Sequence, residues 1–490
     1  MKKLAVVFFA ILSLSSQAQT NVFLDQSFWK SNPDTTAIQA EIAKGNSPSQ
    51  LNANSFDAVV TAINANTSTQ NVKFLLSQKG NEVNKLTHDG RTYVFWAASR
   101  GNVELMEYLI SKGAKVNMMD NHGYSVLNFA AVGGQQNTQV YDLLLKNGAD
   151  LKKELTHEGA NALLLGIAND KDFALTNYFV SKGLDIKSTD AEGNTAFNYA
   201  AKTGNITLLK ALLEKGVKFN NNAMIMASIG SRSGSNTLEV YQYLESLKIN
   251  PAVVNENGQN TLHAIVRKPK QEEIIKYFIA KGADINQVDE DGNTPFMNAA
   301  SGNQDVELIT MLASNVNNIN QVNKKGVSAL AMAMRGNSPE VVSLLIAKGA
   351  DLKVVDAEGD NLAAYLIHSY SPMKPEAFTS KMKVLTDKGF NVAAPQSNGN
   401  TLYHVALTKN NLDLLKALEP LKLDVNAKNK EGMTVLHKAA MTAKDDQILK
   451  YLVTLGAKKD AVTEFKETAF DLASENEFLS KNSVSIDFLK

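Results

Sequence analysis

Apolar residues recur at helical spacing in short blocks along the chain, and the blocks come in pairs. One pair is FMNAA at 296–300 followed by VELITML at 306–312. Apolar residues three and four positions apart lie on one face of an α-helix. The small alanines in the first block permit close contact between helices. The pattern therefore predicts repeated pairs of short helices.

Glycines that follow polar or charged residues mark the register of these pairs. They are Gly90, Gly123, Gly159, Gly193, Gly258, Gly292, Gly326, Gly359, Gly399 and Gly432. Their successive spacings run from 33 to 40 residues, apart from one of 65 that spans two periods with one marker missing. A period near 33 is typical of helical-pair repeats, which bury their apolar faces only by stacking on one another.

The residue two positions after each marker glycine is always Thr, Ser or Asn. These residues are Thr92, Ser125, Asn161, Thr195, Asn260, Thr294, Ser328, Asn361, Thr401 and Thr434. Such side chains accept hydrogen bonds from the free N–H groups at a helix start. We therefore expect each to cap the first helix of its pair. Gly148, Gly282 and Gly349 follow Leu-rich or Ile-rich blocks, where a left-handed residue ends a helix.

The repeated phrase resembles the ankyrin-repeat family, whose pattern is D-G-x-T-P-L-H-x-A-A, then G-N, a Leu-Leu pair and G-A-D-x-N. It recurs as GNTPFMNAASGN at 292–303, GMTVLHKAA at 432–440 and GNTAFNYAAKTGN at 193–205. The resemblance implies an all-α repeat solenoid, in which stacked helix-turn-helix units are joined by β-turn fingers. The unit around Asn222 departs from it, because it lacks a marker glycine.

We expect four segments along the chain: a signal peptide over 1–18, an N-terminal capping region over 19–54, an ankyrin repeat array over 55–462 and a C-terminal capping repeat over 463–490. No linker or low-complexity tract divides the array, so one continuous solenoid is the simplest architecture. The glycine-rich stretch near residue 230 is the predicted point of bending.

The first residues predict export from the cell. Lys2 and Lys3 precede a short uncharged run over 4–14, and Ser16 and Ala18 form a small-x-small cleavage site. The sequence QAQ at the cut resembles the leaders of proteins exported by Bacteroidota. We therefore expect a bacterial periplasmic protein, with secretion outside the cell as the alternative.

Composition narrows the classes of partner. The chain is 44% hydrophobic and 20% charged, and without the two leader lysines its count of 48 basic against 50 acidic residues gives a net charge of −2. A nearly neutral chain has no global field to attract nucleic acid or anionic membrane. No later stretch is long enough to span a bilayer. The absence of cysteine excludes disulfides and thiolate metal sites.

Seven histidines are the first candidates for chemistry. The resemblance implies a bracing role for His263, His404 and His437, which occupy the family's histidine position. Three further histidines lie at consecutive turn tips and suggest a zinc site; they are His88, His122 and His157. Stacked helices lie about 8–10 Å apart, whereas zinc needs each nitrogen within about 2.1 Å. This mismatch favours surface histidines without a metal.

Aromatic residues recur six positions after four of the markers, at Trp96, Phe129, Tyr199 and Tyr365. Such a row suits either stacking on a ligand or packing between layers, and the helical register favours core packing. No phosphate-binding loop, nucleophile elbow or zinc-protease motif is present. We therefore expect no catalytic residue, no metal and no cofactor.

The resemblance implies that recognition uses exposed side chains on a concave face, just after each marker glycine and just after the Ala pair. The candidate partner-binding residues are Arg91, Ser99, Arg100, Tyr124, Asn194, Lys202, Gln259, Asn293, Val327, Arg335, Asp360, Asn400, Lys409 and Met433. This mixed surface suits a protein partner. We expect a monomeric, non-enzymatic scaffold; the alternatives are a secreted effector that binds a host or competitor protein, or an enzyme accessory or metal-binding protein.

Overall fold

A computed structural model describes residues 21–231 and 234–490, so the predicted signal peptide over 1–18 lies outside the described residues. The described residues form helices and turns without a β-strand, which confirms the all-α fold class. The chain divides into two compact units, Met1–Asn220 and Asn221–Lys490. The boundary between the units lies in the repeat that lacks a marker glycine.

The helices of the N-terminal unit are short and mostly come in pairs. In chain order they are η1 Val22–Leu24, α1 Gln26–Lys30, α2 Thr35–Ala43, α3 Ala58–Asn64, α4 Thr69–Leu76, η2 His88–Gly90, α5 Tyr93–Ser99, α6 Val103–Ser111, α7 Val126–Val132, α8 Thr138–Lys146, α9 Ala162–Gly166, η3 Ile167–Asn169, α10 Ala174–Ser181, α11 Ala196–Ala201 and α12 Ile206–Glu214.

The C-terminal unit continues the same alternation. Its helices are α13 Asn222–Ile229, α14 Leu238–Ser246, α15 Thr261–Ile265, α16 Glu272–Ala280, α17 Pro295–Gly302, α18 Val306–Ala313, α19 Ala329–Gly336, α20 Pro339–Ala347, α21 Leu362–His368, α22 Pro375–Asp387, α23 Leu402–Ala406, η4 Leu407–Lys409, α24 Leu412–Ala417, η5 Glu419–Leu421, α25 Val435–Thr442, α26 Gln447–Thr454, α27 Ala469–Glu475, α28 Glu477–Lys481 and η6 Asp487–Leu489.

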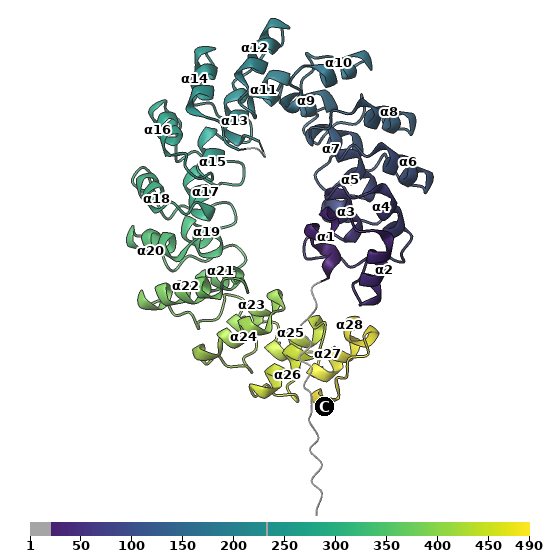
Figure 1. Cartoon of the computed structure of the whole chain (residues 1–490). Coiled ribbons are helices and arrows are strands. Elements are labelled where there is room, and N and C mark those ends of the chain that lie inside the picture. Colours follow the sequence, from purple (N-terminus) through teal and green to yellow (C-terminus); the bar gives the residue numbers. More distant parts are fainter. Residues whose placement is uncertain (1–20, 232–233) are drawn as a thin grey trace, which may run out of the picture. The chain divides into compact units, whose positions relative to one another are not determined.

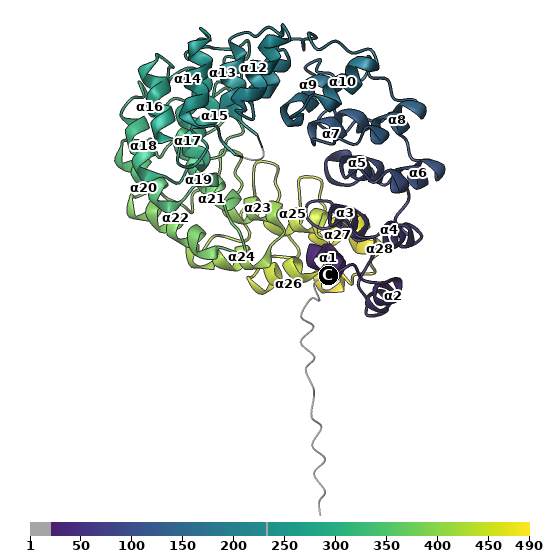
Figure 2. The ribbon, with the colours of Figure 1, turned by 45° about the horizontal axis from the view of Figure 1, so that its top comes forward.

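Within each unit the first helices of the pairs form one row and the second helices form another. In the C-terminal unit, α17 packs on α19 and α18 packs on α20 (Figures 1 and 2). Phe296, Ala299 and Ala300 of α17 are at most 2% exposed, as are Leu308 and Ile309 of α18. The apolar face of each pair is therefore hidden by its neighbours, and the core runs as a layer between the rows.

The turns that carry the marker glycines form fingers. The N–H of Gly292 donates to Asp289 O (2.9 Å), and the N–H of Asp289 donates to Asn293 O (3.0 Å). A backbone hydrogen bond then joins this finger to the preceding one, because the N–H of Glu290 donates to Asn257 O (2.8 Å). The predicted β-turn fingers are thus confirmed, and they are tied into a stack by the main chain.

A marker position needs a positive φ and a small residue. Gly258 has φ +74°, and a Cβ there would lie 2.6 Å from the carbonyl oxygen of Val288 in the next finger. Sequence reasoning missed two fingers whose left-handed residue is not glycine, at Ser55 (φ 58°) and Lys466 (φ 66°). Both lie one repeat length from a marker, so their spacing was the available signal.

The predicted helix ends are largely confirmed. Ser125 Oγ accepts from Asn128 N (3.2 Å), and Thr294 Oγ1 accepts from Met297 N (3.2 Å) with Pro295 in the first turn. The cap prediction is wrong at Thr92, whose buried hydroxyl has no hydrogen-bond partner among the described residues. The helix-ending glycines behave as expected, and Gly148 has φ 102°.

Candidate functional site

The surface made by the fingers and the first helices carries the candidate residues, which fall into three groups by exposure. Arg100, Arg335 and Lys409 are exposed. The half-buried group is Ser99, Tyr124, Lys202, Gln259, Asn293, Val327, Asp360, Asn400 and Met433. Arg91 and Asn194 are buried.

The three exposed candidates are all cations at the ends of first helices. Arg100 is the C-cap of α5, Arg335 lies in the last turn of α19, and Lys409 ends η4. Positive charge at a helix C-terminus is favoured by the helix dipole. Lys409 Nζ also donates to His368 O (2.9 Å) in the preceding repeat. These charges therefore both cap helices and face outward.

Several half-buried candidates are partly used inside the protein. Asn293 Oδ1 accepts from Asn323 Nδ2 (2.9 Å), so this amide links two fingers. The Lys202 ammonium lies 4.9 Å from the ring centre of Tyr199, and burial lowers the pKa of Lys202. Burial, followed by the nearby carboxylate of Asp356, raises the pKa of Asp360. Such residues offer only part of their side chains to a partner.

The expectation of exposed side chains is wrong at Arg91 and Asn194. The Arg91 guanidinium lies 2.7 Å from the Asp120 carboxylate, 3.1 Å from that of Asp89 and 4.3 Å from the ring centre of Phe129. Asn194 Nδ2 donates to Asp190 (2.9 Å). Internal carboxylates draw both side chains inward, so neither is available to a partner.

Two of the turn-tip histidines converge on one carboxylate, which sequence reasoning missed. His88 Nε2 and His122 Nε2 lie 3.3 and 3.2 Å from Asp89 Oδ2. Burial alone would raise the pKa of Asp89, but Arg91 and the histidines lower it. Arg91 already holds the same oxygen, so a metal cation would meet a positive charge there. Within 21–231 and 234–490, no cluster of three ligand side chains suits a metal ion.

The family histidines brace neighbouring repeats, as the resemblance implied. His263 Nδ1 accepts from Asn260 N (3.0 Å), so its Nε2 carries the proton and donates to Asn293 O of the next finger (3.2 Å). His404 and His437 make the equivalent bonds, with Nε2 to carbonyl distances of 3.1 and 2.9 Å. Burial lowers the pKa of all three.

The recurring aromatic residues mainly pack in the core, as expected. Trp96, Phe129 and Tyr199 are each 7% exposed, and only Tyr365 is half-buried. The rings of Trp96 and Phe129 meet edge to face at 5.6 Å. The row is therefore part of the interior and is not a stacking platform.

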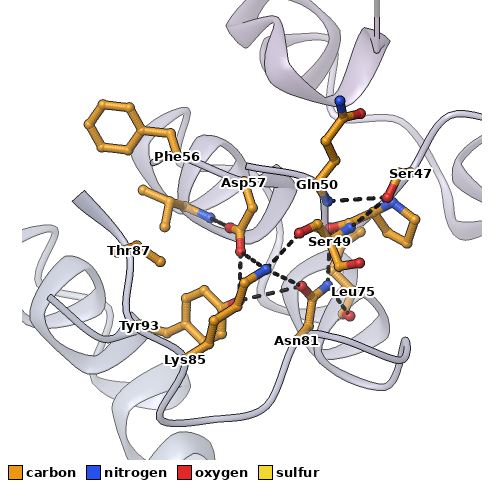
Figure 3. A network of polar contacts seen from close by, with 12 residues as sticks. Ser47, Ser49, Gln50, Phe56, Asp57, Leu75, Asn81, Lys85, Thr87 and Tyr93 are labelled. Carbon is orange, nitrogen blue, oxygen red and sulfur yellow. Dashed lines mark hydrogen bonds and ion pairs between the residues drawn. The ribbon is translucent and has the colours of Figure 1, made fainter. Parts of the chain in front are cut away.

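An ion pair between a buried aspartate and a half-buried lysine in the N-terminal unit is the strongest alternative candidate for chemistry (Figure 3). Asp57, with a fully buried side chain, accepts from Lys85 Nζ (2.8 Å) and the Tyr93 hydroxyl (2.7 Å) on one oxygen. Its other oxygen accepts from Val60 N (3.0 Å) and caps α3. Lys85 also donates to Ser49 O (2.7 Å).

This Asp57 network has no free group for catalysis. Both carboxylate oxygens are occupied, and burial together with the Asp57 charge raises the pKa of Tyr93. The network instead joins the capping region to the first repeat. Sequence reasoning missed it, although Asp57 lies two residues after the left-handed Ser55, in the cap position of the repeat.

Comparison with known proteins agrees with the observed repeats. The family model described as "Ankyrin repeats (3 copies)" matches residues 59–155, 135–225, 224–313 and 262–356. A second model, "Ankyrin repeats (many copies)", matches residues 403–453. These segments together make up well over half of the chain.

Curated relatives are similar to this chain over part of their lengths. The chain is 26% identical over 298 residues to Alpha-latroinsectotoxin-Lt1a of Latrodectus tredecimguttatus, covering 58% of this chain and 20% of the toxin. It is 27% identical over 290 residues to E3 ubiquitin-protein ligase KEG of Arabidopsis thaliana, covering 56% and 18%. It is 23% identical over 402 residues to transient receptor potential cation channel subfamily A member 1 of Homo sapiens, covering 71% and 35%.

The chain thus spans about a third or less of the length of these relatives. No helix among the described residues has the length and apolar character needed to cross a bilayer. The matching family models, the stacked helix pairs and the braced fingers agree: the chain belongs to the ankyrin-repeat family.

Proposed function

We propose that this chain is a non-enzymatic scaffold that binds a protein through the face made by its fingers and first helices. Ankyrin repeats generally mediate protein–protein interaction, which supports a protein partner. The named relatives are a toxin, a ligase and a channel, and this chain covers 20%, 18% and 35% of their lengths. Their activities therefore give no reason to assign an enzyme or a channel here.

Buried and exposed charged side chains differ in whether they have partners inside the protein, and this contrast supports a binding face. The buried ionisable groups Asp57 and Arg91 are both held by internal partners, Asp57 by the half-buried Lys85 and Arg91 by Asp120. Arg335, by contrast, is exposed and has neither an ion pair nor a hydrogen bond among the described residues. Exposed arginines are enriched in protein interfaces. A face with such side chains suits recognition better than catalysis.

Co-purification from cell extract tests this function. We expect one partner to bind the full chain stoichiometrically and to be lost when Arg100, Arg335 and Lys409 are all replaced by alanine. A matched control replaces three lysines on second helices or their ends, namely Lys112, Lys348 and Lys383. Equal loss in both triple variants, or no partner at all, would overturn the proposal.

We further propose that the protein acts in the periplasm of a bacterium as a monomer. The charged start, apolar run and cleavage site within residues 1–18 support export. Cell fractionation tests the location: we expect the mature chain, beginning at Gln19, in the periplasmic fraction. Its recovery from the culture medium would favour the secreted effector. Metal analysis of the purified chain tests the metal-binding alternative.

A further inference from the structure

Exposed valines recur at one register in four consecutive repeats of the C-terminal unit. They are Val254, Val288, Val322 and Val355, with 46%, 41%, 45% and 45% of their surface exposed. Each lies four residues before a marker glycine. We call these four residues the valine row. The N-terminal unit has its own exposed aliphatic residues at the same register, Leu86, Met119 and Leu155.

The fold does not need an apolar residue at this position. Thr189 occupies the same register before Gly193, and Lys428 occupies it before Gly432. Both repeats form the same finger, in which the marker N–H closes the turn. Packing within the chain leaves 41–46% of the surface of each valine exposed, and exposed apolar patches are typical of interaction sites.

The valine row lies at the base of the fingers, beside the starts of the first helices. Val254, Val322 and Val355 each pair by an antiparallel bridge with the residue that caps the first helix of the same repeat. The finger tips lie on one side of the row. The C-terminal ends of the first helices lie on the other side.

Both flanks of the row are charged. Exposed acidic residues lie at three of the four finger tips, Glu256 in the first, Glu290 and Asp291 in the second, and Glu358 in the fourth. The third tip is basic, with Lys324 and Lys325. Arg267 and Arg335 lie near the ends of α15 and α19 on the opposite flank.

The spacing along the row fits a helical partner. Backbone hydrogen bonds of 2.8 to 2.9 Å join the four fingers in order. Packed helices lie about 8–10 Å apart, and this distance sets the step from one valine of the row to the next. Seven residues of an α-helix rise about 10.5 Å. In a β-strand, side chains on the same face are two or four residues apart, which corresponds to about 6.6 or 13 Å. The spacing of apolar side chains at every seventh residue of a helix therefore matches the spacing of the valines, whereas the spacing of side chains on one face of a strand does not.

We propose that the valine row binds an amphipathic helix of a partner protein, about 22 residues long, with an apolar residue at every seventh position. The helix carries basic residues opposite the three acidic tips and acidic residues opposite Lys324, Lys325, Arg267 and Arg335. The longest helix among the described residues of this chain is α22, with 13 residues. The described part of a second copy therefore cannot supply the helix.

A synthetic peptide tests the geometry with the full-length chain. The probe is a labelled 28-residue helical peptide with leucine at every seventh position and the flanking charges given above. The comparison peptide has the same composition with leucines at alternate positions. We expect fluorescence anisotropy to show at least tenfold tighter binding of the helical peptide. Equal binding of the two peptides would overturn the proposal.

Substitutions in the row test the site. V288K combined with V322K should weaken binding of the helical peptide at least tenfold, and lysine is compatible with the finger because Lys428 holds this register. A neutral double variant, V288T with V322T, introduces the residue type that Thr189 provides at this register, and it should weaken binding several-fold. The control V306K changes a valine of 39% exposure at the start of α18 and should leave binding unchanged. Wild-type affinity in V288K/V322K would overturn the proposal.

This inference rests on the proposed scaffold function, but the two fail in different ways. If V288K/V322K still co-purifies with the protein partner, the helix-binding site is wrong and the scaffold function stands. If no protein partner is found with the wild-type chain, the scaffold function fails, and the peptide measurements alone decide whether the row binds helices.

Discussion

At the scale of single residues, the molecule separates side chains that hold repeats together from those left for a partner. The Asp57 network is the clearest example of the first kind. Removing one partner of a fully buried ion pair costs about 3–5 kcal/mol, and solvent reduces this cost here because the Lys85 side chain is 15% exposed. We expect D57A to lower the free energy of unfolding of the N-terminal unit by at most this amount in a denaturant titration. E104A breaks the exposed pair with Lys73 and should leave the midpoint unchanged; similar losses in both variants would contradict this reading.

The bracing histidines give stability a defined pH dependence. Burial lowers the pKa of His263, His404 and His437 below the ordinary value of 6.5. The unfolded chain then binds more protons than the folded chain in the range just below pH 6.5. Stability is therefore fully present above pH 6.5 and falls as the pH drops from there toward the folded pKa. We expect the denaturant midpoint to fall between pH 7 and pH 5, and H404Q to reduce this dependence. A midpoint that rises on acidification would show that the imidazoles are charged in the fold.

At the scale of elements, the finger stack depends on the marker glycines. G258A places a Cβ in a left-handed position and 2.6 Å from a backbone oxygen of the next finger. The left-handed conformation alone costs a residue with a Cβ about 1–2 kcal/mol, and the clash adds to that. The control G349A has φ +92° but no atom within 4 Å of its Cβ. Thermal unfolding should show a larger loss for G258A than for G349A; equal losses would mean that the fingers do not depend on close backbone contact.

The elements were largely predictable from the sequence, and the reasons are local. Apolar spacing gives the helix pairs, and a cap such as Thr294 acts on N–H groups a few residues away. The burial of Arg91 was not predictable in this way, because its partner Asp120 lies 29 residues further on. Likewise, Ser55 and Lys466 adopt left-handed conformations that are unusual for residues other than glycine. The finger imposes these conformations only once it has formed, so the residue type alone does not indicate them.

At the scale of the whole molecule, the chain consists of two compact units, each with its own stacked core. Both tryptophans, Trp29 and Trp96, lie in the N-terminal unit. Tryptophan fluorescence therefore reports unfolding of that unit, whereas circular dichroism reports the helices of both. The stability of a repeat array is approximately the sum of the stabilities of its repeats and of the interfaces between neighbouring repeats.

We expect G258A, in the C-terminal unit, to shift the transition seen by circular dichroism and to leave the fluorescence transition in place. D57A should shift the fluorescence transition. A shift of the fluorescence transition in G258A would show that the two units unfold as one.

Site-specific photocrosslinking in cells can capture a protein bound to one face of this repeat protein. A photoreactive residue at position 335 lies on the first-helix row, and one at position 383 lies on the exposed side of α22. We predict one light-dependent adduct with a single protein from position 335 and none from position 383. No adduct from position 335, or the same adducts from both positions, would show that this face does not bind a specific protein partner.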